Sequence, residues 1–494
     1  MAYTVTSELV AAAVAAAIPR LACQLPRDVF DALKKARRAE DHPRGCVVLG
    51  NLVDNAFVAC SDNVPICQDT GTVWVSLEIG PDVSMSGDVF AGIDAAVARA
   101  YEEACLRKSL VKDAAFDRAN TGDNTPAFTD IHVVDEPGVA RLRIMLKGGG
   151  SDNASRVVML VPGDGRAAIV DEVVRCVREK AANACAPLVV GIGIGSTFDK
   201  VAGLAKRALM RPLDVEAPTE QAAQLEHELE EALRESGVGA GGLGGGSVAL
   251  AVRVATAPCH IAALPLAINM GCSALRRATI DLTDDAGRVN AQLDTQLVGP
   301  SYICGGETDE VEVPRAKAKD AVKVSLPLDK EAAASLEAGD ACLLTGAMYT
   351  LRDAGHIRLM EEMGSTGQLP YGLEGQSIFY AGPTPEAAGR PFGAVGPTTS
   401  SRMDFATPAL YDAGVAATVG KGRRNAQVRE ACKRNGSVYF VATGGAAALL
   451  AKQVESAELV AYEDLGTEAL RRIEVVDFPV FVGIDAKGND VYDA

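Results

Sequence analysis

In the stretch Val64-Pro65-Ile66-Cys67-Gln68-Asp69-Thr70-Gly71-Thr72, a thiol, an amide, a carboxylate and a hydroxyl occupy four consecutive positions. Because Pro65 fixes one backbone dihedral angle and Gly71 permits a tight turn, we expect these polar groups on a constrained loop. A cysteine close to an aspartate suits a metal centre with a neighbouring acid/base group. A buried cysteine followed by an ordinary turn fits the same residues. The stretch alone leaves both interpretations open.

The composition is that of an ordinary globular protein. The chain has 494 residues, of which 48% are hydrophobic and 23% are charged. This length allows roughly two to four domains with a large core. The formal net charge of −17 argues against a partnership with nucleic acid or with an anionic membrane. It leaves room for a small anionic substrate, because a local group of Arg and Lys can line a cleft.

The N-terminus and the cysteines predict a cytoplasmic protein without disulfides. The first residues contain no basic segment, and the apolar run from Leu9 to Ile18 is only about half as long as a membrane span. The twelve cysteines are scattered singly, with no C-x-x-C pair. Any metal site must therefore take its ligands from distant segments of the chain.

Glycine-rich segments are the next candidates for ligand loops. Residues 147–151 follow an expected strand at Arg141–Leu146, and their three glycines expose backbone N–H groups that can hold an anion. A flexible turn fits these residues equally well. Residues 191–195 resemble half of a dinucleotide fingerprint, but its third glycine and a matching acidic residue are missing. This disfavours a nucleotide-binding oxidoreductase.

The chain changes character after about 290 residues. Before this point we expect a helix-rich N-terminal domain, residues 1–290. Charged and polar residues then dominate in 291–321, which we expect to be a linker or crossover. In residues 322–494, alternating strands and helices predict a compact C-terminal α/β domain. The predicted fold class is thus α/β, of the mixed α+β kind.

Several motifs occur together, in one order, along the chain. They are Cys67-Gln68-Asp69-Thr70-Gly71, Asn120-Thr121-Gly122-Asp123-Asn124-Thr125-Pro126-Ala127, Lys147-Gly148-Gly149-Gly150-Ser151, Gly396-Pro397-Thr398-Thr399-Ser400-Ser401-Arg402-Met403, Gly420-Lys421-Gly422 and Ile473-Glu474-Val475-Val476-Asp477-Phe478-Pro479. In this combination the chain resembles the iron–sulfur class I fumarate hydratases and their relatives, the L-tartrate dehydratases. The resemblance implies that an α-type and a β-type part are fused in one chain.

The resemblance implies a [4Fe–4S] cluster held by only three cysteines. The sequence around Cys67, Cys185 and Cys272 matches the ligand positions of the family. Three thiolates leave one iron with open coordination, which can act as a Lewis acid on a substrate hydroxyl and carboxylate. We expect the other cysteines to be packing residues, including Cys259, Cys304 and Cys342.

The resemblance also implies catalytic groups and substrate contacts. Thr398 is the expected base for the C–H proton, supported by Asp69, because a Thr hydroxyl alone is a poor base. His260 is the next candidate, although a lone histidine beside an apolar strand is often a core residue. The expected contacts to the substrate are Gln68, Arg107, Gly149, His260, Arg352, Thr399, Arg402 and Lys421. The chain departs from the family pattern at Leu351, where members tend to have glycine.

The expected function is the reversible hydration of fumarate to (S)-malate by a homodimer. L-Tartrate and mesaconate differ from these diacids by one hydroxyl or methyl group, and no residue decides between them. A cluster-carrying sensor without turnover is a further alternative, against which the presence of Thr398, Arg402 and Lys421 argues. The expected partner is a small dicarboxylate, with neither nucleic acid nor membrane.

Overall fold

The computed structural model describes residues 3–282, 292–293, 295–299, 302, 321–386 and 389–493. Three helices at the start of the chain lead to the Cys67 loop: α1 (Ser7–Cys23), α2 (Arg27–Ala39) and α3 (Pro43–Asp62). The Thr6 side chain caps α1 by accepting a hydrogen bond from the N–H group of Leu9. α3 is capped by Asn63, whose left-handed backbone directs the chain into the loop.

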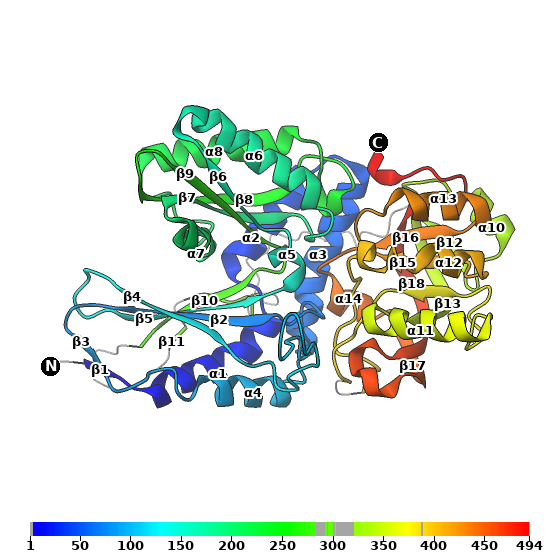
Figure 1. Cartoon of the computed structure of the whole chain (residues 1–494), viewed down its shortest axis with the longest axis horizontal. Helices are drawn as coiled ribbons and strands as arrows, with labels where there is room; N and C mark the ends of the chain where they lie inside the picture. The colour runs from blue at the N-terminus through cyan, green and yellow to red at the C-terminus, as the bar shows by residue number, and fades with distance from the viewer. Residues whose placement is uncertain are drawn as a thin grey trace.

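The first sheet has five strands in the order β11-β10-β5-β2-β4. Its strands are β2 (Thr72–Ile79), β4 (Phe128–Val133), β5 (Ala140–Lys147), β10 (Arg276–Asp281) and β11 (Gln292–Leu293). The helices α1 and α4 (Ile93–Glu103) share an apolar core with β2 and β5 (Figure 1). At the edge of this region β1 (Tyr3–Val5) pairs with β3 (Val83–Met85). Because β2 follows the Cys67 loop and β5 leads into Gly148, this sheet anchors both loops.

The second sheet has four strands in the order β6-β9-β7-β8. They are β6 (Arg156–Leu160), β7 (Leu188–Ser196), β8 (Ala249–Cys259) and β9 (Leu264–Gly271). One face packs on α6 (Gly165–Lys180) and α8 (Glu220–Glu235), and α7 (Phe198–Ala208) packs on β7 from the other side (Figure 1).

The glycines of the half fingerprint lie inside β7 and form no nucleotide loop. A Cβ atom on Gly193 would lie 2.6 Å from the carbonyl oxygen of Val201 in α7. Glycine is therefore needed here so that the helix can approach the strand closely.

The third sheet has seven strands in the order β12-β13-β14-β15-β16-β18-β17. They are β12 (Val322–Ser325), β13 (Ala341–Thr350), β14 (Ser377–Phe379), β15 (Ala417–Gly420), β16 (Val438–Ala442), β17 (Val454–Ala461) and β18 (Leu470–Ile484). β18 pairs with both β16 and β13, so the strands from β13 to β16 and β18 close into a ring around an apolar core. Arg352, Thr398 and Lys421 follow the carboxyl ends of the parallel strands β13, β14 and β15. The ends of these strands meet at one edge of the sheet, which brings the three residues together.

Short helices and turns complete the structure. The helices are α5 (Gly149–Asp152), α10 (Lys330–Ser335), α11 (Asp353–Thr366), α12 (Thr407–Asp412), α13 (Ala426–Asn435) and α14 (Ala447–Ala451). 3₁₀ turns lie at Pro162–Asp164, Ala240–Gly242, Ser400–Met403, Glu463–Glu468 and Val491–Asp493.

The mixed α/β class is confirmed, but strands contribute more than the sequence predicted. The strands β4, β6 and β17 lie in segments for which no strand was predicted. All three lie at an edge of their sheet and expose apolar as well as polar side chains, so their sequences lack the strict alternation of half-buried strands. No helix within the described ranges is long and apolar enough to cross a membrane.

α3 joins the N-terminal part of the molecule (residues 3–282) to the C-terminal part (residues 321–493). Asn55 donates hydrogen bonds to the carbonyl groups of Ile66 and Gly445, both at 3.0 Å. One apolar core runs from α2 and α3 into the C-terminal sheet. At the end of α3, burial opposes ionisation of Asp62, but hydrogen bonds from Arg390 and Lys452 outweigh it and lower the pKa of Asp62 to about 2.

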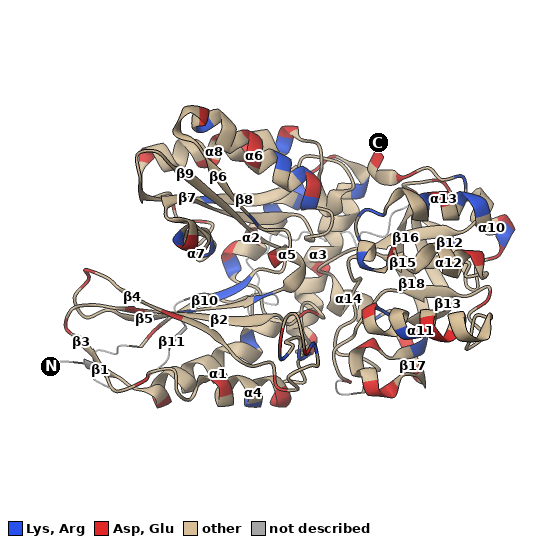
Figure 2. Ribbon diagram, in the orientation of Figure 1, with Lys and Arg blue, Asp and Glu red and all other residues tan. Residues whose placement is uncertain are grey.

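Acidic and basic residues are interspersed along the ribbons of both parts (Figure 2). Most of the expected linker, with Cys304, lies outside the described residues, and the division at residues 290 and 322 stays a prediction.

Candidate active site

A cavity between the two parts collects nearly all of the predicted site residues. Its lining comprises Cys67, Gln68, Asp69, Arg107, Gly148, Gly150, Ser151, Ala184, Cys185, Cys272, Arg276, Arg352, Pro397, Thr398, Thr399, Arg402 and Lys421. Gly149 stands between two lining residues and donates its N–H group to Asp69 Oδ2 at 2.9 Å. The cavity thus unites loops that are up to about 350 residues apart in the sequence, because α3 holds the two parts together.

The Cys67 loop is fixed at its C-terminal end by buried hydrogen bonds. Thr70 Oγ1 donates to the carbonyl oxygen of Arg107 at 2.7 Å, and the Tyr101 hydroxyl donates to that of Gly71 at 2.9 Å. Gly71 has a φ of +89°, and a Cβ atom there would lie 2.9 Å from the backbone of Leu146. The expected constrained loop is confirmed, and its glycine is needed for the close approach of β5.

Three thiols from three separate loops line the cavity. Cys185 follows α6 in a left-handed conformation (φ 61°), and Cys272 directly follows β9. Burial raises the pKa of Cys67 to about 12, while the nearby Arg276 guanidinium opposes this rise. Lys421 Nζ donates a hydrogen bond to Cys185 Sγ at 2.7 Å. One cavity therefore holds three soft sulfur ligands together with cations, of which Arg276 favours the thiolate form of Cys67 and Lys421 that of Cys185.

This donor set fits a cluster better than a single ion. Among the described residues, no three His, Cys, Asp or Glu side chains converge closely enough to hold one metal ion. Three cysteines that line one cavity without meeting at a point suit a larger iron–sulfur core. Space is kept free at Cys185 by Gly444, where a Cβ atom would lie 2.6 Å from the sulfur.

Asp69 is held as a carboxylate beside the thiols. Arg107 Nη2 lies 3.3 Å from Asp69 Oδ1, and the N–H groups of Gly71 and Gly149 donate to its two oxygens. Burial opposes ionisation of Asp69, but the charges of Arg107 and Arg276 outweigh it and keep the pKa of this carboxyl below its usual value. Asp69 is therefore ionised at neutral pH.

Two arginines of the C-terminal part share one carboxylate. Asp353 Oδ1 accepts from Arg402 Nε at 2.9 Å, and Asp353 Oδ2 lies 3.2 Å from Arg352 Nε. Arg352 Nη2 also donates to Glu468 Oε1 at 2.6 Å. These anions hold both guanidinium groups at the cavity, where a planar fork can meet a substrate carboxylate with two hydrogen bonds.

Thr398 presents a buried hydroxyl without a partner. Its side chain is only 4% exposed, and Thr398 Oγ1 has no hydrogen-bond partner within the described part of the chain. The backbone is fixed, because the Thr398 N–H group donates to the carbonyl of Tyr380 at 2.6 Å. A buried hydroxyl that lines a cavity without a partner is available to a ligand.

A buried group behind the cavity supports its loops, and the sequence did not predict it. The Tyr439 hydroxyl donates to the carbonyl of Gly422 at 2.8 Å and lies 2.9 Å from Ser400 Oγ. It thereby links the loop of Thr398 to the loop of Lys421. The guanidinium of Arg424 lies over the Tyr439 ring at 4.8 Å and pairs with Asp404 at 2.6 Å.

His260 is the predicted catalytic residue that the chain does not bring to the cavity. It is exposed in the turn after β8, where its ring accepts a hydrogen bond from the Ala262 N–H group at 3.1 Å. The expectation that His260 completes the site is therefore not met within one chain. Cys259 beside it is exposed too, which corrects its prediction as a packing residue, whereas Cys342 is buried as expected.

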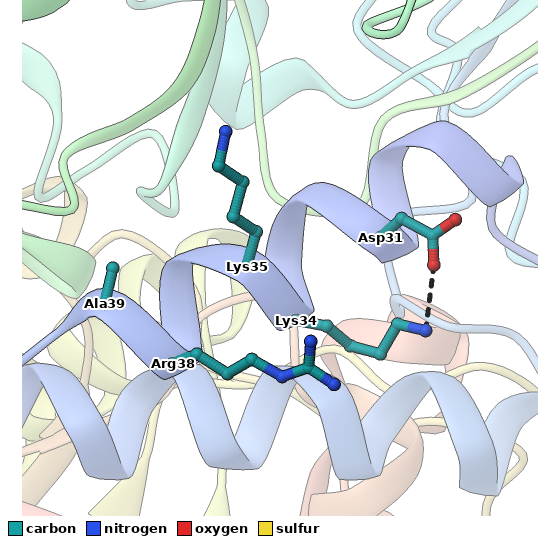
Figure 3. Close-up of a pocket in the computed structure, with 5 residues that line it drawn as sticks. All are labelled: Asp31, Lys34, Lys35, Arg38 and Ala39. Carbon is teal, nitrogen blue, oxygen red and sulfur yellow. Dashed lines mark ion pairs between the residues drawn. The ribbon is translucent and has the colours of Figure 1, made fainter. Parts of the chain in front are cut away.

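A second hollow lies on the surface of α2 and is separate from this cavity. It is lined by Asp31, Lys34, Lys35, Arg38 and Ala39 (Figure 3). Lys34 Nζ lies 2.8 Å from Asp31 Oδ1, so its charge is already compensated, and Lys35 points away from both. We assign no binding function to this hollow.

The comparisons with known proteins match this arrangement. The model of the fumarate hydratase (Fumerase) family covers residues 11–281, and that of the fumarase C-terminus covers residues 305–494. The chain is 33% identical to the anaerobic class I fumarate hydratase of Escherichia coli over 461 residues, which are 89% of this chain and 81% of that protein. It is 32% identical to fumarate hydratase 2 of Leishmania major over 94% of this chain and 83% of that protein. The α subunit of an Escherichia coli L(+)-tartrate dehydratase matches 54% of the chain at 32% identity, with 88% of the subunit covered.

Fold, site and matches together define a hydro-lyase. The chain belongs to the class I fumarate hydratase family, with the α-type and β-type parts fused in one chain as expected.

Proposed function

We propose that this protein catalyses the reversible hydration of fumarate to (S)-malate with a [4Fe–4S] cluster on Cys67, Cys185 and Cys272. The observation that supports the proposal best is the cavity itself, in which three thiols, an unpartnered threonine hydroxyl and five cations lie together. The cations are Arg107, Arg276, Arg352, Arg402 and Lys421. When bound, such a cluster supplies a Lewis acid for the substrate hydroxyl.

We expect the arginines of the cavity to bind the two carboxylates of the diacid substrate. Arg352 and Arg402 extend from the C-terminal part and Arg107 from the N-terminal part, and all three line the same cavity. A diacid held between them draws both parts together and excludes water, which strengthens each ion pair. Gln68 and Thr399 add uncharged polar groups to the same lining.

Thr398 and Asp69 handle the proton. In the direction from malate to fumarate, Thr398 Oγ1 takes the proton from the carbon beside the carboxylate while its own hydroxyl proton passes to the Asp69 carboxylate. That proton is then returned to the departing substrate hydroxyl, which leaves as water. A neutral threonine needs a negative neighbour for this role, and Asp69 is kept ionised by Arg107 in the same cavity. Hydration reverses these steps.

L-Tartrate and mesaconate are the alternative substrates of the same site, and the match to a tartrate dehydratase subunit supports including them. The decisive experiment is an anaerobic assay of the reconstituted protein on fumarate, L-tartrate and mesaconate side by side. We expect fumarate to give the highest kcat/KM. A preference for L-tartrate would reassign the substrate, and no turnover of any diacid would refute the proposed function.

The cluster is tested by a matched pair of cysteine variants. Cys67→Ser removes a proposed ligand, whereas Cys342→Ser removes a buried thiol outside the cavity. We expect loss of bound iron and activity in the first variant alone. Equal iron content in both variants would contradict the ligand assignment.

We also propose that the protein is a cytoplasmic homodimer. Light scattering of the purified protein tests the dimer, and fractionation of the cells that produce it tests the location.

A further inference from the structure

Arg276 is a buried cation in the cavity for which the reaction outlined above has no role. It begins β10, four residues after Cys272, and its side chain is 1% exposed. Its Nη2 donates to the carbonyl oxygen of Asp69 at 2.7 Å, which fixes the guanidinium against the Cys67 loop. Its Nε and Nη1 have no hydrogen-bond partner among the described residues.

Unpartnered N–H groups on a fully buried arginine cost free energy of folding, so they indicate that a bound ligand supplies the missing hydrogen-bond acceptors. The ligand must be an acceptor in the cavity that Arg276 lines. The guanidinium lies against the Cys67 loop, to which it is hydrogen-bonded through the Asp69 carbonyl oxygen. The arginines of the C-terminal part, by contrast, have carboxylate partners in Asp353 and Glu468.

We propose that Arg276 compensates the charge of the cluster, by donating its two free N–H groups to sulfur at the Cys67 side. This inference rests on the proposed [4Fe–4S] cluster. It has a physical basis in the charge balance of the cavity, because Arg107 is paired with Asp69 and Lys421 with Cys185. Thiolates and sulfides accept hydrogen bonds, and such bonds set the reduction potential and lability of iron–sulfur clusters.

The neighbouring residue provides a matched control. Arg277 is also buried, at 2% exposure, but it points to the opposite face of β10, where it pairs with Asp28 outside the cavity. Arg276→Gln and Arg277→Gln therefore remove the same charge from adjacent positions of one strand. Arg276→Lys keeps the positive charge but has a single nitrogen in place of the unpartnered Nε and Nη1 of arginine. It therefore still tests the hydrogen bonds to sulfur if Arg276→Gln folds poorly.

The experiment measures bound iron, the rate of iron release to a chelator and the reduction potential of the anaerobically reconstituted proteins. We expect Arg276→Gln to release iron about 10–100-fold faster than the wild type, the usual range for partners of metal ligands. Its reduction potential should fall, because removal of a positive charge destabilises the more negative reduced cluster. Arg276→Lys should lie between the two, and Arg277→Gln should match the wild type in both measurements.

Two outcomes would overturn the inference. Unchanged iron release and potential in Arg276→Gln, with a raised KM for the diacid, would make Arg276 a substrate ligand. Equal changes in Arg276→Gln and Arg277→Gln would trace the effect to general destabilisation. Absence of iron from the reconstituted wild type is a different result, since it refutes the proposed function and this inference with it.

Discussion

Replacing Tyr439 by phenylalanine tests whether the loops of Thr398 and Lys421 must be held together. The substitution keeps the buried ring under Arg424 and removes one hydroxyl, with its contacts to Ser400 Oγ at 2.9 Å and to the Gly422 carbonyl at 2.8 Å. A buried hydrogen bond contributes about 0.5–1.5 kcal/mol net, so the loss of two predicts a fall of about 1–3 kcal/mol in the free energy of unfolding.

The substitution should also slow catalysis, because Tyr439 positions the loops that carry Thr398 and Lys421. Displacement of a positioning loop by about 1 Å can cost about 100-fold in rate, so we expect kcat for fumarate to fall about 10–100-fold while bound iron is unchanged. Tyr411→Phe is the matched control, because the Tyr411 hydroxyl is equally buried and contacts Thr418 Oγ1 at 2.6 Å and the Val438 carbonyl at 3.3 Å, away from both loops.

The assay combines steady-state kinetics, iron analysis and hydrogen exchange of both loops. Tyr439→Phe should exchange faster over residues 398–402 and 420–422, and Tyr411→Phe should not. Equal losses of kcat in the two variants, or normal kcat in Tyr439→Phe with the expected loss of stability, would refute the reasoning.

Three further predictions concern the site and its support. Thr398→Ala should lower kcat by at least about 100-fold and Asp69→Asn comparably, with a double mutant little worse than either, since residues that act as a unit are not additive; additive losses with the cluster intact would show that they act separately. Arg402→Ala should lower kcat/KM by about 2 kcal/mol or more without changing the cluster spectrum, whereas Lys421→Ala should change both, because Lys421 also donates to Cys185; an unchanged spectrum in Lys421→Ala would contradict this contact. Asp62→Asn should lower the free energy of unfolding of the apoprotein by about 2 kcal/mol at pH 7, as measured in urea. The pKa of Asp62 is lowered from about 3.9 in the unfolded chain to about 2 in the folded protein, so its ionised carboxylate stabilises the fold above about pH 3.9. This stabilisation is lost as the pH falls through the folded value, so the free energies of unfolding of the wild type and Asp62→Asn should converge towards pH 2. A difference that stays constant with pH would show that ionisation is not the cause.

The local sequence was sufficient to predict structure where the functional groups and the residues that restrict the backbone lie in one segment. The Cys67 loop is an example, because Pro65 and Gly71 restrict the backbone between α3 and β2 regardless of the rest of the chain. The pattern in the C-terminal part likewise predicted a strand at residues 341–349 and a helix at residues 353–363, close to the observed bounds of β13 and α11. The resemblance of the motifs to one family identified the thiols and most of the cavity lining, which no spacing rule would have found.

The tertiary structure decided which polar groups have partners. Arg276 and Arg277 are adjacent and chemically identical, yet one faces the cavity with two unpartnered N–H groups and the other pairs with Asp28. Their sequence cannot show this, because successive side chains of a strand point to opposite faces, and the packing of other segments determines what each face meets. For the same reason the hydroxyl of Tyr439 supports two loops, while His260, chosen for its chemistry, lies exposed at a turn outside the cavity.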